Sequence, residues 1–261
     1  MLKNDSVVTI RTPSGISGDM LVTGLSLLAE ADAAILDSIV ADTGMNVPDG
    51  SFKIERTAVD EISGWRAKVT LPNEHVHRSH DDIRKIITGS QLRSGAKEIA
   101  LKAFSILADA EATVHDLASE DVTFHEVGAL DSILDICLAA ALIDMLAPQE
   151  IVCSPLPICD GQVMSAHGLL QTPAPAVQEL LVGIPVYSVD TDGETVTPTA
   201  LALLRAIAAR FGAWPPQRIA KSVRVYGSRI LPNIPNGAIF AIGCPLSKEE
   251  LSSWEMALSD D

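Results

Sequence analysis

The chain has 261 residues, 47% of them hydrophobic, and its 34 acidic against 19 basic side chains give a formal net charge of −15. A chain of this length and hydrophobic content can bury a sizeable core, in one large domain or two small ones. The acidic balance argues against binding of nucleic acid or anionic lipid, which depends on clustered Lys and Arg, and it favours the attraction of metal cations.

No stretch approaches the ~20 uncharged apolar residues of a membrane span. The best candidate, Ile133 to Leu146, is interrupted by Asp135 and Asp144. The first residues lack the apolar core of a signal peptide. The four cysteines have no CxxC spacing, which indicates neither a zinc site nor a disulfide framework. We therefore expect a cytoplasmic protein with no membrane or nucleic-acid partner.

The N-terminal segment predicts a strand, a glycine-rich turn and a helix. Val7 to Ile10 is a β-branched run typical of a buried strand. Residues 13–20, with the sequence PSGISGDM, form the turn, and a helical pattern follows through Val40. This arrangement offers free backbone N–H groups to an anion at a helix N-terminus, although the segment matches no known nucleotide fingerprint. The alternative is that Ser17 or Asp19 only caps the helix.

Two strands and two helices are expected in the next part of the chain. Ser51 to Val59 and Trp65 to Leu71 alternate with the period of strands and predict a hairpin. Helices are predicted at Asp82 to Thr88 and at Leu92 to Val114, where apolar residues recur at three- and four-residue steps.

A histidine-rich segment lies between this hairpin and these helices. His75, His77 and His80 fall within six residues, in a chain that has six histidines in all. Beside three acidic residues, they indicate metal binding. A solvated polar loop before a helix would have the same composition, so both interpretations stay open.

The segment on which the functional prediction depends is residues 123–135, with the sequence TFHEVGALDSILD. His125 and Glu126 precede a glycine turn, and Asp131 and Asp135 follow at the start of an expected helix. Because the two aspartates are four residues apart, they lie on one helix face, where like charges repel and a bound cation would relieve the repulsion. The alternative is that Asp131 caps the helix and Asp135 faces water.

Two Thr-Pro pairs indicate helix starts in the C-terminal half. Thr172 and Thr197 are predicted N-caps with the following proline at the first helical position, leading into helices to Leu181 and to Arg210. Helix N-termini that point into one pocket would form anion sites. His167 is a weaker candidate for such a pocket, because a lone histidine is more often structural than a ligand.

Three further strands complete the expected fold, at Ile151 to Cys153, Arg218 to Tyr226 and Ala238 to Ile242. The expected class is α/β (mixed α+β), with strands and helices alternating around a mixed sheet. We expect one compact unit over residues 1–247, followed by a polar acidic tail at residues 248–261.

Four motifs resemble, in the same order, those of LarC-type nickel insertion proteins. They are the glycine-rich segment 13–20, the HEVGAxDSxxD segment 124–136, residues 166–168 with 172–176, and residues 196–199. The first two are the specific ones. The chain is similar to the N-terminal region of that family over nearly its whole length.

The resemblance implies a function that composition does not show. Family members insert nickel into pyridinium-3,5-bisthiocarboxylic acid mononucleotide in a CTP-dependent cyclometallation, which yields the nickel-pincer cofactor. The implied cofactors are Ni²⁺ and CTP with a divalent cation. The implied partners are the pyridinium mononucleotide substrate and a separate chain carrying a C-terminal domain, and a homo-oligomer is compatible with the resemblance.

Three groups of residues are expected to form the site. Metal or catalytic roles are expected for His125, Glu126, Asp131 and Asp135. Collection and delivery of nickel is expected for His75, His77 and His80. Binding of the mononucleotide phosphate, or of a metal-bridged nucleotide, is expected for Ser14, Gly15, Ser17, Gly18, Asp19 and, as a weaker candidate, His167.

Two other functions would use the same residues. A non-catalytic nickel-binding or carrier protein would bind the metal without consuming nucleotide. A metal-dependent nucleotide or phosphate-ester hydrolase would use the carboxylates to hold its metal. Nucleotide turnover without the pyridinium substrate would favour the hydrolase.

Overall fold

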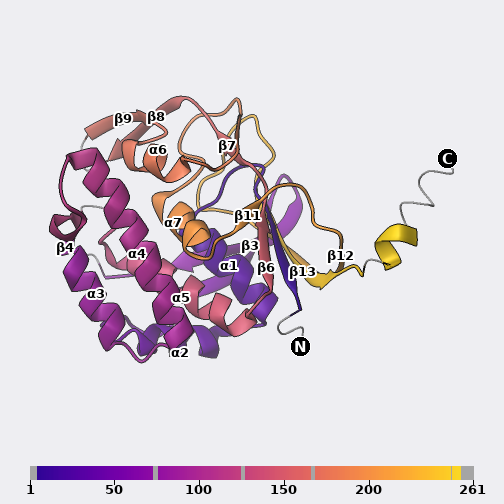
Figure 1. The fold of residues 1–261 in the computed structure, drawn as a ribbon, viewed down its shortest axis with the longest axis horizontal. Coiled ribbons are helices and arrows are strands. Elements are labelled where there is room, and N and C mark those ends of the chain that lie inside the picture. Colours follow the sequence, from indigo (N-terminus) through magenta and orange to yellow (C-terminus); the bar gives the residue numbers. More distant parts are fainter. Residues whose placement is uncertain (1–4, 73–75, 125–126, 166–167, 248, 254–261) are drawn as a thin grey trace.

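The computed structural model describes residues 5–72, 76–124, 127–165, 168–247 and 249–253 (Figure 1). The helices are α1 (Gly18–Ala29), α2 (Ala33–Asp42), α3 (His80–Gly89), α4 (Ser94–His115), α5 (Leu130–Leu146), α6 (Pro175–Leu181) and α7 (Pro198–Ala206), with a 3-10 turn at Ser119–Asp121. The strands of the large sheet are β1 (Val7–Arg11), β2 (Phe52–Val59), β3 (Ile62–Val69), β6 (Glu150–Cys153), β11 (Arg210–Phe211), β12 (Gln217–Val225) and β13 (Ala238–Pro245). Shorter strands pair as β4 (Arg78–Ser79) with β5 (Thr123–Phe124), β7 (Leu156–Ile158) with β10 (Val186–Ser188), and β8 (Gly161–Ser165) with β9 (Gly168–Thr172).

The large sheet has the strand order β11-β6-β1-β13-β12-β3-β2. Strand β1 runs parallel to β6 and antiparallel to β13, and β12 is antiparallel to β13 but parallel to β3. The sheet is therefore mixed, and the predicted mixed α/β class is confirmed. The predicted hairpin of β2 and β3 is also confirmed, with Phe52 opposite Val69 and Val59 opposite Ile62.

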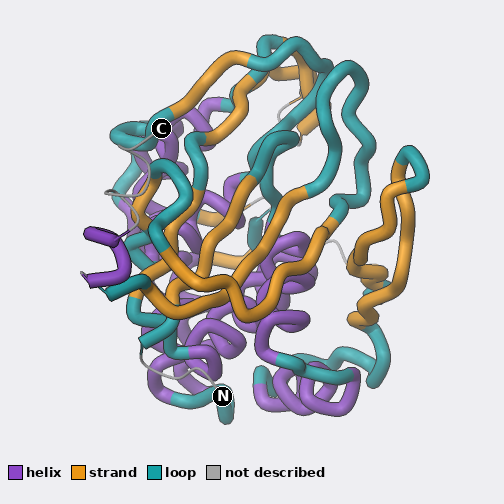
Figure 2. Tube along the Cα trace, turned by 90° about the vertical axis from the view of Figure 1, so that its right-hand side faces the viewer, coloured by secondary structure: helices purple, strands orange, loops and turns teal. Residues whose placement is uncertain are grey.

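The helices form layers on one side of the sheet (Figure 1). Helix α1 packs on β3, β12 and β13, α5 packs on α1, and α4 packs on α5 and α7. The view turned by 90° shows the strands side by side, with the helices beside and below them (Figure 2). Helix α5 is buried on nearly all sides, as its almost continuous apolar sequence requires. An aspartate on such a helix needs a cavity or a partner.

The prediction of one continuous helix through Val40 was wrong, because the structure has two helices there, α1 and α2. Helix α1 ends at Ala29, and its C-cap residue Glu30 has a left-handed φ of 57°. Helix α2 begins after Asp32, whose carboxylate accepts a hydrogen bond of 3.0 Å from the backbone N–H of Ile35. This N-cap separates the helices although the apolar pattern continues across the break.

The prediction for the first Thr-Pro pair was wrong. Thr172 ends strand β9, the Thr172–Pro173 peptide is cis, and α6 begins after Ala174 with Pro175 in its first turn. The Thr172 hydroxyl donates to the Cys159 carbonyl over 3.2 Å instead of capping a helix. At the second pair the predicted N-cap is confirmed, since Thr197 caps α7 and its hydroxyl accepts from the Ala200 N–H. The predicted end at Arg210 was wrong, because α7 ends at Ala206 and Arg210 begins β11, which pairs with β6.

Helix α1 lies close to the sheet at Gly24. A Cβ there would lie 2.4 Å from the Phe240 ring, which is fully buried. Gly24→Ala is therefore expected to lower the free energy of unfolding by about 1 to 3 kcal/mol, because a packed core cannot absorb the extra methyl group. Gly89→Ala is the control, since a Cβ on Gly89 meets nothing within 4 Å. Urea unfolding followed by circular dichroism compares them, and equal stabilities would contradict the close packing.

Candidate functional site

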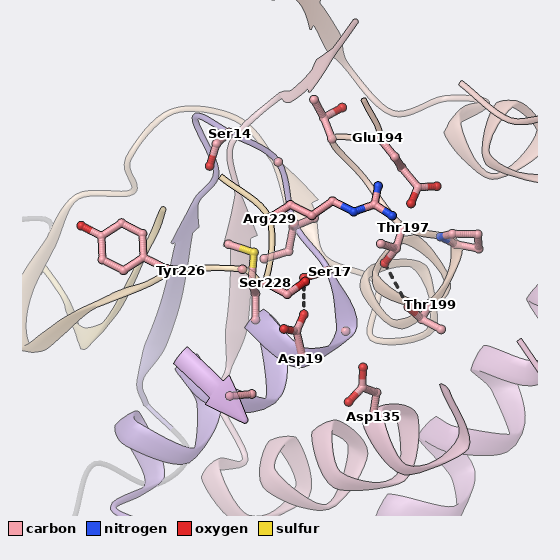
Figure 3. Close-up of a pocket in the computed structure, with 18 of the residues that line it drawn as sticks. Ser14, Ser17, Asp19, Asp135, Glu194, Thr197, Thr199, Tyr226, Ser228 and Arg229 are labelled. Carbon is pink, nitrogen blue, oxygen red and sulfur yellow. Dashed lines mark hydrogen bonds between the residues drawn. The ribbon is translucent and has the colours of Figure 1, made fainter. Parts of the chain in front are cut away.

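A cavity of about 520 Å³ lies where α1, α5 and α7 begin, beside the loop that follows β12 (Figure 3). Three of its sides come from segments that the sequence motifs identify. They are the glycine-rich turn after β1, the first turns of α5, and the Thr-Pro start of α7. The cavity therefore brings together three motifs that are far apart in the chain.

Gly15 joins two of these segments. The Ile16 N–H donates to the Thr195 carbonyl over 2.9 Å, and the Thr197 N–H donates back to the Ile16 carbonyl over 3.1 Å. Gly15 has a φ of 99°, and a Cβ on it would lie 1.7 Å from the Thr195 carbonyl oxygen. Only glycine allows the turn after β1 to lie this close to the segment before α7.

The first turn of α1 lacks a side-chain cap. Ser17 is the N-cap, but its hydroxyl donates to the Asp19 carboxylate and caps no backbone N–H. The first helical hydrogen bond is made by the Leu21 N–H. The backbone N–H groups of Gly18, Asp19 and Met20 accordingly have no acceptor in the described part of the chain, and all three residues line the cavity. These free donors are suited to an anion or to water.

Asp135 lies directly against the start of α1. A Cβ on Gly18 would lie 2.5 Å from the Asp135 Oδ2 atom, so the close approach of α1 and α5 depends on this glycine. Asp131 and Asp135 both line the cavity, as their four-residue spacing predicts. Asp131 is exposed and accepts from the Ser132 N–H over 2.8 Å. The alternatives for this pair were wrong, because Asp135 is partly buried at the cavity and the N-cap of α5 is Ala129.

Burial raises the pKa of Asp135 well above the ordinary value for an aspartate, and the nearby carboxylates of Asp19 and Asp131 raise it further. The expected repulsion between the carboxylates is therefore present. A cation would relieve it by favouring the ionised form of Asp135. The cavity can thus attract a cation at its carboxylates and an anion at the free N–H groups of α1.

The histidine-rich segment meets the second motif through backbone pairing. Arg78 pairs with Phe124 and Ser79 with Thr123, so β4 lies beside the residues that lead into the HEVG sequence. The Arg78 guanidinium also donates to the Gly128 carbonyl over 2.8 Å. The structure brings the two predicted metal-binding segments side by side, although neither β4 nor β5 lines the cavity.

The predicted metal ligands are only partly described. His80 begins α3, and its ring meets the edge of the Phe124 ring at 6.3 Å, while His77 is exposed. Within the described ranges, no group of three or more His, Cys, Asp or Glu residues is arranged to hold a metal ion. The other candidates lie outside the described residues, and so their roles stay predictions: His75, His125, Glu126 and His167.

The prediction from sequence missed the side of the cavity formed by the loop after β12. Tyr226, Gly227, Ser228, Arg229 and Asn236 line it, but they show no periodicity or ligand spacing. The one feature in the sequence that could have pointed to this loop is a single arginine among Gly, Pro and Asn residues. Such a residue gains meaning only when the fold places it at a cavity.

The fold and the site define a mixed α/β protein with an acidic cavity at the start of three helices. No helix in the described residues is long and apolar enough to cross a membrane. Residues 8–259 match the family described as nickel insertion protein. The chain belongs to this family.

Two relatives illustrate the similarity. A protein from Geobacter sulfurreducens, whose name refers to nickel insertion, is 41% identical over 225 residues, which are 85% of this chain and 57% of the relative. The pyridinium-3,5-bisthiocarboxylic acid mononucleotide nickel insertion protein of Desulfitobacterium hafniense is 38% identical over 208 residues, which are 80% of this chain and 51% of the relative. The chain thus spans little more than half the length of these relatives. No solved structure matches it significantly.

Proposed function

We propose that the protein takes part in inserting nickel into pyridinium-3,5-bisthiocarboxylic acid mononucleotide, the substrate in the name of the Desulfitobacterium hafniense relative. The observation that carries this proposal is the pairing, in one cavity, of the desolvated Asp135 carboxyl with the free N–H groups of α1. A cation and a phosphorylated ligand can bind there side by side. Family membership supports nickel as the cation.

In this proposal Asp131 and Asp135 receive Ni²⁺, the metal substrate of the reaction. Nickel accepts carboxylate and imidazole ligands, and the softer sulfurs of the substrate then take it over. Because the pKa of Asp135 is raised, a proton competes with a cation for this carboxyl more strongly than for an ordinary aspartate.

The remaining predicted residues have defined places in the proposal. His125 and Glu126 complete the metal set, and His75, His77 and His80 deliver nickel along the paired strands β4 and β5. Support for the delivery path is the pairing of Arg78 with Phe124, one residue before His125. His167 stays the weaker candidate for binding the phosphate.

The phosphate of the mononucleotide, or of CTP with its divalent cation, binds the turn after β1. The residues proposed for this role are Ser14, Gly15, Ser17, Gly18 and Asp19, which all line the cavity. The proposed partner for use of CTP is a separate chain carrying a C-terminal domain.

Calorimetric titration of Ni²⁺, with and without CTP, tests this proposal. The Asp131→Asn/Asp135→Asn double variant is expected to bind Ni²⁺ roughly 10- to 100-fold more weakly than the wild type while keeping its fold. The charge-matched control is Asp116→Asn/Glu120→Gln, since both side chains are exposed and outside the cavity. A His125→Ala/Asp131→Asn variant tests the second motif in the same way.

The outcomes separate the candidate functions. Metal binding at the cavity would be rejected if Asp131→Asn/Asp135→Asn and His125→Ala/Asp131→Asn both keep the Ni²⁺ affinity of the wild type while their melting temperature falls. Tight binding without an effect of CTP would favour a nickel carrier. Turnover of nucleotide without the pyridinium substrate would favour a hydrolase.

A further inference from the structure

Arg229 is the one cationic side chain that lines the cavity within the described residues. The other charged lining residues are acidic: Asp19, Asp131, Asp135 and Glu194. Arg229 is exposed, and no described carboxylate lies within ion-pair distance of it, although the chain has 34 acidic residues. An unpaired guanidinium at the mouth of an acidic cavity indicates a ligand with an anionic group.

The loop that carries Arg229 is held at both ends. On the N-terminal side, the Tyr226 hydroxyl donates to the Ile62 carbonyl over 2.9 Å. On the C-terminal side, the Asn236 side chain accepts from the Leu231 N–H over 2.9 Å and donates to the Leu231 carbonyl over 2.7 Å. These bonds limit the conformations of the loop. Binding of a ligand to Arg229 therefore costs little conformational entropy of the loop.

The side chain of Arg229 extends across the cavity (Figure 3). Its guanidinium lies toward the side of Thr197 and Glu194, while Asp135 lies on the far side, beyond Ser17 and Asp19. The guanidinium thus lies on one side of the cavity, near Glu194, and the carboxyl groups of Asp19 and Asp135 lie on the other. A ligand that fits this division has an anionic end and an end that carries or receives a cation.

We infer that Arg229 binds the phosphate of the pyridinium mononucleotide and so orients the pyridinium ring toward the carboxylates that hold nickel. This inference rests on the proposed function. The planar guanidinium can donate two parallel hydrogen bonds to phosphate oxygens, which fixes direction as well as adding affinity. The free N–H groups of α1 can bind the same phosphate from the opposite side.

A binding cycle with two ligands tests this assignment on the full chain without nickel, so that no reaction occurs. The ligands are pyridinium-3,5-bisthiocarboxylic acid mononucleotide and the nucleoside obtained by removing its phosphate. In the wild type, loss of the phosphate is expected to weaken binding about 10- to 100-fold, the range of a charge-assisted hydrogen-bonded contact. In Arg229→Ala the same removal should weaken binding at least about threefold less than in the wild type, because only the N–H groups of α1 then remain to bind the phosphate.

Arg224→Ala is the matched control, since Arg224 lies on β12 outside the cavity. It should bind both ligands as the wild type does, and Arg229→Lys should recover part of the phosphate dependence. If phosphate removal weakens binding equally in the wild type and Arg229→Ala, the inference is wrong while the proposed function stands. If the wild type binds neither ligand, the proposed function is wrong and the inference falls with it.

Discussion

The Gly15→Ala variant is expected to lose about 2 to 5 kcal/mol of unfolding free energy, the sum of left-handed backbone strain and steric overlap. The strain arises because Gly15 has a φ of 99°, which an L-residue rarely adopts. The overlap arises because a Cβ would lie 1.7 Å from the Thr195 carbonyl oxygen, and backbone cannot rotate away as a side chain can. Relief requires the turn after β1 to separate from the segment before α7. Urea unfolding followed by far-UV circular dichroism measures the loss.

A second glycine, Gly44, separates the effect of backbone strain from that of steric overlap. Gly44 also has a left-handed φ, of 73°, but a Cβ on it meets nothing within 4 Å. Gly44→Ala should therefore lose only the conformational part, about 1 kcal/mol. Equal losses in the two variants would show that the contact with Thr195 contributes nothing. Ligand binding at the cavity should fall in Gly15→Ala and stay unchanged in Gly44→Ala.

Much of the fold could be predicted because long elements repeat one period. The hairpin of β2 and β3, helix α4 and strands β12 and β13 each carry an alternation or a helical stripe over eight residues or more. Strands β7, β10 and β11 have only two or three residues, too few to show a period. Their positions are set by partners distant in sequence, as when Val186 pairs with Leu156. Such pairings leave no local signal.

Individual residues of the candidate site could be predicted from the sequence, but the contacts between them could not. Spacing alone places Asp131 and Asp135 on one face of a helix, and both do line the cavity. Nothing in the sequence brings Gly18 against Asp135, because that contact depends on how α1 packs on α5. Arg229 shows the same limit, since its charge is informative only once the fold places it at the same cavity as the carboxylates.

The Asp135→Asn variant is expected to be more stable than the wild type at neutral pH and to bind Ni²⁺ more weakly. The pKa of Asp135 is raised in the folded state, by burial first and then by Asp19 and Asp131. The folded chain therefore holds this proton more tightly than the unfolded chain, where the pKa of an aspartate is about 3.9. The stabilisation is complete below that value and is lost as the pH rises toward the folded-state pKa, by up to about 1.4 kcal/mol per pH unit. Asparagine keeps the shape of the side chain without the charge.

Urea unfolding of both proteins between pH 4.5 and 8 checks this expectation. The stability advantage of Asp135→Asn should grow as the pH rises from 4.5, and a constant difference would contradict a raised pKa. Asp19→Asn supplies the internal test of cause, because it removes a neighbouring charge but leaves Asp135 buried. It should reduce the pH dependence without abolishing it. A gain in stability together with a loss of Ni²⁺ affinity in Asp135→Asn would indicate that this carboxyl is kept for binding a cation at a cost to the fold.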